Sequence, residues 1–132
     1  MKVAREKFNV PDRISSFTVP LGSQMNYDGS VLLYGCVIMF ICQVCGQAVS
    51  IEMMLRVVLL SAILSTGGGG IPGSGIVKLL VVVEAFNLPT EIVGIIAAFY
   101  RLFDMRTTTN NCLGDLVGTV LISRLEEKRS RR

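Results

Sequence analysis

Residues 65–75 read STGGGGIPGSG and form a glycine-rich break between two apolar runs. Inside a helix, glycine costs about 1 kcal/mol and proline about 3 kcal/mol relative to alanine, so this stretch cannot continue one. The flanking runs, residues 56–64 and 76–86, are each about half or less of the roughly 20 apolar residues that a membrane-crossing helix needs. We therefore expect a re-entrant helical hairpin over residues 53–86, whose non-helical tip lies at membrane depth and faces a site.

The composition places this hairpin in a membrane protein. Apolar residues make up 51% of the 132-residue chain and charged residues 17%, and the mean hydropathy is +0.57. Such a chain is too apolar for an ordinary soluble domain of this size. The predicted fold class is an all-α membrane protein, in which two interrupted membrane-spanning helices flank the re-entrant hairpin.

The basic residues predict the orientation of the chain. Because cytoplasmic segments of membrane proteins are rich in lysine and arginine, we expect both ends to be cytoplasmic and the number of full crossings to be even. A nucleic-acid-binding tail is the alternative, but a basic cluster beside an apolar span more often contacts lipid headgroups. Nine of the thirteen basic residues lie at the ends: Lys2, Arg5, Lys7, Arg13, Arg124, Lys128, Arg129, Arg131 and Arg132.

Polarity divides the chain into successive segments. We expect one membrane unit over residues 14–125, with short polar segments on either side of it. In order, these are a polar cytoplasmic lead-in over 1–13, a broken helix over 14–49, the hairpin over 53–86, a last helix over 92–125, and a basic cytoplasmic tail over 126–132.

A polar patch over residues 22–30 interrupts the first helix and holds Asn26 and Asp28 near membrane depth. A carboxylate at that depth is costly and usually pairs with a cation or lines a wet path. The alternative is a surface turn between two soluble elements, because the sequence Asn-Tyr-Asp-Gly also has turn chemistry.

The last helix carries a second polar interruption, from Asp104 to Asn111. Asp104, Thr108, Asn111 and Asp115 recur at offsets of 0, 4, 7 and 11, so they share one helical face. The two aspartates lie about 16 Å apart along the axis, too far for the paired carboxylates of a glycosidase. The stripe therefore indicates separate cation and substrate positions. A soluble amphipathic helix could show a similar stripe.

Other functional classes find little support. The chain has no histidine, and the CxxC of Cys42 and Cys45 sits in an apolar run, so we expect buried, inert thiols and no enzyme. A phosphate-binding loop would need Lys-Ser or Lys-Thr where this chain has Ile76 and Val77. Lys78 and Glu84 lie six residues apart in the hairpin, so they do not pair along the helix; they snorkel or face a polar cavity.

The motifs together carry a family resemblance. Val-Pro-Leu-Gly over 19–22, Asn-Tyr-Asp-Gly-Ser over 26–30, residues 65–75, and the run from Asp104 to Asp115 resemble the C-terminal part of the dicarboxylate/amino acid:cation (sodium) symporter family, the glutamate transporter homologues. The resemblance covers residues 17–125. It implies a secondary active, sodium-coupled symporter for small amino acids, in which a transport domain moves past a trimeric scaffold by an elevator-type mechanism.

The resemblance also implies site residues, with sodium as the coupling ion and no other cofactor. One sodium would be held by the carbonyls of Gly22, Asn26 and Asn111 and the carboxylate of Asp115, a second by carbonyls of Gln24, Ser65, Thr66 and Gly68, and a third in part by Asp28 with Asn26. The substrate's amino group would bind Asp104. The other implied substrate-binding residues are Ser30, Ile71, Gly75, Thr107, Thr108 and Asn111.

Three departures from the family pattern bear on the substrate and the ions. Thr107 stands where members that take acidic substrates have arginine, and Arg106 lies about 100° away around the helix. We therefore expect neutral amino acids such as serine, threonine or alanine, with an acidic amino acid or a dicarboxylate as the alternative. Tyr27 replaces a usual methionine and Tyr100 a common aspartate, which leaves the coupling ratio open.

The family's earlier helices and first re-entrant hairpin have no counterpart in these residues. We therefore expect a fragment or one part of a split transporter, which needs the missing N-terminal part and is a homotrimer when complete. It would be a multi-pass protein of the inner or plasma membrane and inactive in transport alone. A small membrane subunit acting through a larger partner is the remaining alternative.

Overall fold

The computed structural model describes residues 1–67 and 73–130, and these contain helices and no strand. The all-helical prediction is therefore confirmed for this part of the chain. The helices are α1 (Lys2–Phe8), α2 (Asp12–Met25), α3 (Asp28–Val44), α4 (Ile51–Gly67), α5 (Ser74–Ala85) and α6 (Glu91–Ser130).

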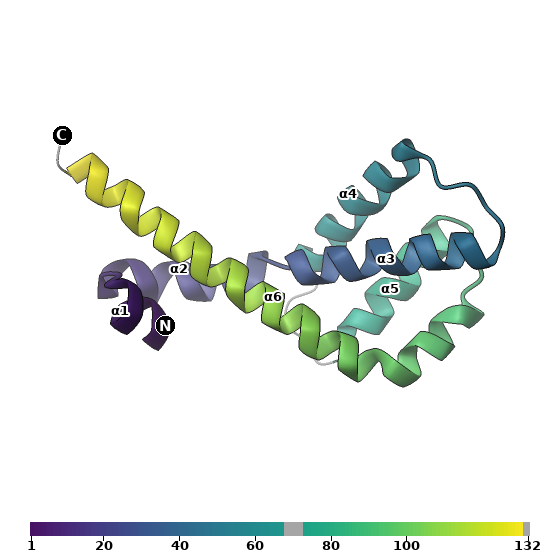
Figure 1. Ribbon diagram of the computed structural model, residues 1–132, viewed down its shortest axis with the longest axis horizontal. Coiled ribbons are helices and arrows are strands. Elements are labelled where there is room, and N and C mark those ends of the chain that lie inside the picture. The colour runs from purple at the N-terminus through teal and green to yellow at the C-terminus, as the bar shows by residue number, and fades with distance from the viewer. Residues whose placement is uncertain (68–72, 131–132) are drawn as a thin grey trace.

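The long helix α6 organises the molecule (Figure 1). Its C-terminal half lies beside α1 and α2, and its N-terminal half lies beside α3 and α5. Helix α1 and the C-terminal end of α6 lie at the same end of the molecule. This arrangement agrees with basic termini on one side of a membrane, while the side itself stays a prediction.

The predicted break in the first helix is present at Asn26 and Tyr27. Asn26 is extended, with φ −93° and ψ 111°, and α3 restarts at Asp28. The two halves together run over Asp12–Val44 rather than the predicted 14–49, because Gly46 adopts a left-handed φ of 66° and ends α3. Among the described residues, Asp12–Val44 is the one helical run long and apolar enough to cross a membrane.

The second predicted interruption is wrong as a statement about the backbone. Helix α6 continues unbroken through residues 104–111 and includes most of the predicted basic tail. The run from 104 to 111 has no glycine or proline, and its threonines bond back into the helix. Thr107 Oγ1 donates to the Asp104 carbonyl at 3.0 Å and Thr109 Oγ1 to the Met105 carbonyl at 2.8 Å. Polar side chains satisfied in this way do not break a helix.

The polar lead-in also has more structure than expected, since it forms α1 and the start of α2. Pro11 precedes α2, and the fixed φ of proline suits the start of a helix. Arg5 holds α1 against α2: its guanidinium donates to Ser15 Oγ at 2.8 Å and pairs with Asp12 at 2.8 Å. The lead-in is thus folded onto the end of the molecule.

Helices α4 and α5 are the arms of the predicted hairpin, and they contact each other. The arms begin at Ile51 and end at Ala85, close to the predicted bounds of 53–86. The tip, residues 68–72, lies outside the described residues. Helix α5 starts after Gly73, whose left-handed φ of 80° suits glycine. That the hairpin re-enters a membrane remains a prediction.

A small apolar core joins α3 to α4, α5 and the start of α6. Its α3 residues recur at the three- and four-residue spacing of one helical face. Cys42 belongs to this core, whereas Cys45, predicted to be buried, is exposed. The core residues are Tyr34, Val37, Ile38, Ile41, Cys42, Val57, Leu79, Val82, Val83, Leu88, Val93 and Ile96.

Large apolar side chains also cover the opposite faces of the same helices and are exposed. They include Leu32 and Phe40 on α3, Leu55 and Ile63 on α4, and Phe99 on α6. Many exposed apolar side chains on several helices favour contact with lipid or with further protein. The described part of the chain therefore presents surfaces suited to lipid or to further protein.

Candidate functional site

A cavity of about 370 Å³ lies where the break before α3, the start of α5 and the middle of α6 meet. We call it the central cavity, and its volume falls within the range of small-molecule sites, roughly 300–1,000 Å³. Most of its lining residues are polar or charged, although the chain as a whole is largely apolar. The lining residues are Tyr27, Ser30, Tyr34, Gly73, Ser74, Gly75, Lys78, Tyr100, Arg101, Asp104, Thr107, Thr108 and Asn111.

All the predicted substrate-binding residues except Ile71 line this cavity, and Ile71 lies outside the described residues. They come from three elements that are far apart in sequence. Helix α6 contributes Asp104, Thr108 and Asn111 from one face, α3 contributes Ser30 from its first turn, and α5 contributes Gly75. The structure thus brings these residues together, and their role in binding stays a proposal.

Asn111 is held in a defined orientation. The backbone N–H of Gly29 donates to Asn111 Oδ1 at 2.8 Å, so the side-chain NH₂ group is left to donate. The contact requires glycine, since a Cβ at position 29 would overlap the backbone of Thr107. The cavity therefore has an oriented amide donor, which suits an anionic group.

Asp104 supplies the negative charge of the cavity and is half-buried. Arg101 Nη1 lies 4.0 Å from its carboxylate, but the Arg101 side chain is 89% exposed. An exposed pair of this length contributes little, so Asp104 remains able to bind a ligand ammonium. Sequence reasoning missed Arg101, although its position three residues before Asp104 places it on the same side of the helix.

The residues predicted to hold the first sodium also converge. Asn26 Nδ2 donates to the Asn111 carbonyl at 3.1 Å and to Asp115 Oδ1 at 3.2 Å. Gly22 lies so close that a Cβ there would sit 2.6 Å from Asp115 Oδ1. We call Gly22, Asn26, Asn111 and Asp115 the Asn26 cluster. With Asp28, three of its members line a second cavity of about 440 Å³ between α2 and α6.

The residues predicted to hold the second sodium are only partly gathered. Ser65 is 1% exposed, and its hydroxyl has no hydrogen-bond partner among the described residues. The hydroxyl of Thr66 donates back to the Ala62 carbonyl at 3.0 Å. Gln24 is exposed near the end of α2, and Gly68 lies outside the described residues.

Three tyrosines and a lysine in the central cavity were not predicted as site residues. The Tyr34 hydroxyl donates to the Gly75 carbonyl at 3.0 Å and fixes the start of α5. Tyr27 and Tyr100 line the cavity with it, and the chain has no other tyrosine and no tryptophan. Lys78 lines the cavity. Of the two predicted alternatives, snorkelling or facing a polar cavity, the structure therefore shows the second.

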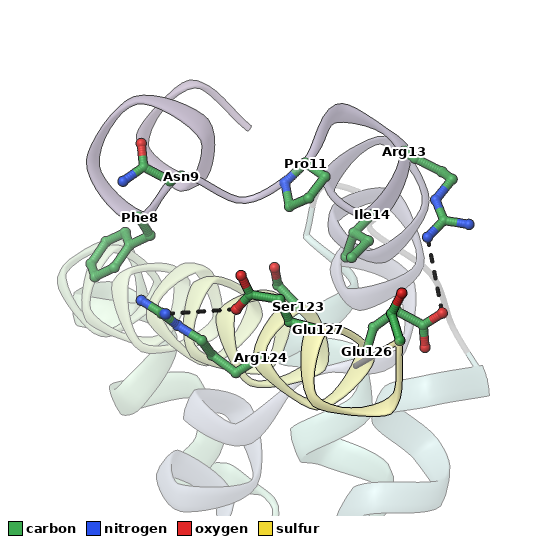
Figure 2. A pocket seen from close by; sticks show the side chains of 10 residues that line it. Phe8, Asn9, Pro11, Arg13, Ile14, Ser123, Arg124, Glu126 and Glu127 are labelled. Carbon is green, nitrogen blue, oxygen red and sulfur yellow. Dashed lines mark ion pairs between the residues drawn. The ribbon is translucent and has the colours of Figure 1, made fainter. Parts of the chain in front are cut away.

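Another cavity, of about 420 Å³, lies between the N-terminal helices and the end of α6 (Figure 2). Its charged residues face one another: Arg13 pairs with Glu126 and Arg124 with Glu127, each at 3.9 Å. No predicted site residue lines it. The Arg13–Glu126 pair joins α2 to the end of α6, whereas Arg124 and Glu127 pair within α6.

A broken helix, two hairpin arms and a long helix with a polar face enclose a polar cavity within largely apolar surfaces. This arrangement is the one expected for the binding part of a membrane transport protein. The sequence profile of the sodium:dicarboxylate symporter family matches residues 1–125. The chain belongs to the sodium:dicarboxylate symporter family.

Individual relatives agree with the family match. The chain is 35% identical over 127 residues to mouse excitatory amino acid transporter 3, covering 96% of this chain and 24% of the relative. It is 33% identical over 121 residues to the Bacillus caldotenax proton/sodium-glutamate symport protein, covering 92% and 29%. It is 30% identical over 132 residues to human neutral amino acid transporter B(0), covering 100% and 24%.

The chain thus spans about a quarter of the length of the curated relatives it matches. These relatives are transporters rather than enzymes, as their names state. Both the predicted family and the prediction that the chain is not an enzyme are confirmed.

Proposed function

We propose that this chain is the substrate- and ion-binding part of a secondary active, sodium-coupled symporter for small, neutral amino acids. The observation that carries the proposal is the convergence of Asp104, Asn111 and Ser30 on one cavity, directly beside the Asn26 cluster. A carboxylate and neutral donors suit a zwitterion, and clustered oxygens suit a sodium ion. The match to sodium-coupled and neutral amino acid transporters supports the same function.

In the proposed complex the substrate lies between the start of α5 and the middle of α6. Asp104 binds its ammonium group, since an ionised acceptor strengthens such a hydrogen bond. The Asn111 amide donates to its carboxylate, together with the hydroxyls of Ser30 and Thr108. Backbone near Ile71 and Gly75 completes the carboxylate site, at the N-terminal end of a helix that favours anions.

Sodium binds in the Asn26 cluster, through the carbonyls of Gly22, Asn26 and Asn111 and the carboxylate of Asp115. Asp28 contributes to a further sodium with Asn26. The two kinds of ligand are then linked through one residue, because Asn111 offers its carbonyl to the ion and its amide to the substrate. An ion that fixes this residue orders the substrate site as well, which is how two sites acquire a coupling free energy.

Thr107 supports the preference for neutral substrates. It is 7% exposed, and its hydroxyl donates to the Asp104 carbonyl. It supplies no guanidinium for a side-chain carboxylate, and Arg106 is exposed and does not line the central cavity.

An acidic amino acid or a dicarboxylate is the second candidate substrate class. One observation favours it: the Arg101 side chain lines the central cavity. In that case Arg101 would bind the substrate's side-chain carboxylate, and Arg101→Gln would lower aspartate binding but not serine binding.

We propose that a complete transport cycle needs further protein in addition to this chain. The exposed apolar faces of α3, α4 and α6 and the quarter-length match to the relatives support a unit that packs against further helices. We propose an elevator-type movement of this unit in a trimeric assembly of the inner or plasma membrane, with both termini cytoplasmic. A small subunit that acts through a larger membrane partner is the competing assembly.

Equilibrium binding of radiolabelled serine to the chain in lipid nanodiscs tests the proposed function. Sodium chloride is compared with choline chloride at equal ionic strength, and unlabelled serine or aspartate serves as the competitor. We expect saturable binding in sodium only, displaced by serine more readily than by aspartate. Equal serine binding in both salts would contradict the proposal.

A further inference from the structure

Lys78 projects from α5 toward the C-terminal end of α4. Its ammonium nitrogen donates to the Ser65 carbonyl at 3.2 Å and lies 5.0 Å from the centroid of the Tyr27 ring. A cation at this distance from an aromatic ring is attracted by the ring's negative face. The lysine is thus held between two elements of the site rather than extended toward solvent.

The place that the ammonium occupies is suited to a cation. Ser65 lies in the last turn of α4, where carbonyls lack partners within the helix and carry the negative end of its dipole. The Ser65 hydroxyl is buried without a hydrogen-bond partner among the described residues, and so is the Tyr27 hydroxyl. A carbonyl at a helix C-terminus and the unpartnered hydroxyl of the same residue are oxygen ligands of the kind that a small cation binds.

We propose that the Lys78 ammonium takes the place of one coupling ion. This inference rests on the proposed function and on the second sodium position that the family resemblance implies, to which carbonyls of Ser65 and Thr66 belong. An ammonium and a sodium ion carry the same charge and both bind carbonyl oxygens. A tethered ammonium on the Ser65 carbonyl therefore satisfies this position permanently, and the chain couples to fewer sodium ions than its motifs imply.

Charge repulsion prevents the Lys78 ammonium and a sodium ion from binding the Ser65 carbonyl at the same time. A sodium ion on the same carbonyl would lie about 4 Å from the ammonium, and repulsion at that separation near a protein surface weakens binding by roughly a thousandfold. Two other roles for Lys78 make different predictions. A plain helix cap leaves the number of bound sodium ions unchanged when it is removed, and a contact with the substrate carboxylate lowers serine affinity instead.

The test counts sodium ions by equilibrium binding of radioactive sodium to the full chain in nanodiscs. Lys78→Met and Lys78→Gln remove the charge, Lys78→Arg retains it, and Lys7→Met removes a charge from exposed α1 as a control. We expect both neutral variants to bind one more sodium ion per chain than the wild type. Lys78→Arg and Lys7→Met keep the wild-type number. An unchanged number in the neutral variants would overturn the proposal.

Thermal unfolding covers the case in which the neutral variants are unstable. If a cation is needed at the Ser65 carbonyl, sodium but not choline should raise the melting temperature of Lys78→Met more than that of the wild type. Equal responses of the two proteins to sodium would overturn the inference without any count of ions.

Asp115→Asn separates this inference from the proposed function. If Asp115→Asn leaves sodium binding unchanged, both in the wild type and in the Lys78 variants, the proposed function itself is contradicted. Sodium binding that needs Asp115 but does not change with Lys78→Met contradicts only the role of Lys78. A higher count in Lys78→Met, with one ion lost in Asp115→Asn, supports both.

Discussion

Asn111 is the residue at which the proposed ion and substrate sites meet. Its backbone carbonyl accepts a hydrogen bond from the Asn26 side chain, and its side-chain oxygen accepts one from the Gly29 backbone N–H. The carbonyl and the side chain of Asn111 therefore contact different parts of the molecule. The two aspartates of α6 lie on either side of Asn111, since Asp104 lines the central cavity and Asp115 belongs to the Asn26 cluster. We therefore propose that they bind different ligands.

Replacing Asp104 tests the ammonium contact. Asp104→Asn keeps the size of the side chain but removes the charge, and a hydrogen bond to a charged group contributes about 1.5–3 kcal/mol. We expect serine affinity to fall by roughly tenfold to a hundredfold, while sodium binding persists. Parallel isotope-binding curves for serine and sodium measure both. An unchanged serine affinity would remove Asp104 from the site.

Replacing Asp115 tests the ion contact. Asp115→Asn removes the one formal charge in the Asn26 cluster, so a dehydrated sodium ion loses its strongest ligand. We expect the sodium dependence of serine binding to weaken more than the preference for serine over aspartate. Serine binding measured across a sodium series gives both quantities. A sodium response equal to that of the wild type would count against the assignment.

Substrate preference rests on the charge near Thr107. Thr107→Arg introduces a guanidinium that can bind a carboxylate in bidentate fashion, so we expect the ratio of aspartate to serine affinity to rise by roughly tenfold or more. Competition binding measures that ratio. A ratio that stays at its wild-type value would show that position 107 does not select the substrate.

Asp104, Thr107 and Asp115 could be predicted from the sequence because they lie in a motif of fixed spacing. Tyr34 and the partner of Lys78 could not, since their contacts join segments 41 and 13 residues apart in the chain. A tyrosine in an apolar helix reads equally well as a core residue. Its role in holding Gly75 becomes visible only when the helices are packed.

At the scale of elements, glycine allows α2 and α6 to approach at the Asn26 cluster. A Cβ on Gly22 would meet Asp115, and a Cβ on Gly114 would overlap the Asn26 amide. The two glycines face the side chains of the opposite element, so the crossing is close in both directions. The positions of Asp115 and Asn26 in the cluster therefore depend on the absence of a Cβ at residues 22 and 114.

Gly22→Ala tests this crossing. The added methyl would displace Asp115, so we expect weaker sodium binding, by about tenfold or more if one charged ligand is misplaced. Gly35→Ala is the matched control, because a Cβ at that position meets nothing within 4 Å. Sodium titrations of both variants make the comparison. Equal affinities would show that the crossing is looser than described.

The breaks in the chain were predictable to different degrees. Glycine and proline punctuation located the ends of α4 and α5, and the Asn-Tyr-Asp-Gly stretch located the break before α3. The run from Asp104 to Asn111 was misread as a break because polarity alone was counted. Threonine and asparagine there face the cavity or bond within the turn, and the α6 backbone continues.

At the scale of the whole molecule, α6 runs from the N-terminal helices α1 and α2 to the region of α3 and α5 (Figure 1), and residues 100–111 of it line the central cavity. The charge of the two ends predicts only the side of the membrane on which they lie, which stays a prediction, and the packing of α3 between the hairpin arms and α6 was not predictable. The apolar runs are similar to one another, so sequence could not say which faces form the core and which remain exposed. Those exposed faces are where further protein or lipid would pack.

The central claim is that sodium and a small amino acid bind to coupled sites in this chain. Fluorescence of Tyr27, Tyr34 and Tyr100, which all line the cavity, can follow both titrations in nanodiscs. Linkage requires sodium to raise serine affinity by the same factor by which serine raises sodium affinity. The account predicts equal factors well above one that collapse in Asp115→Asn. A factor of one in both titrations would contradict it.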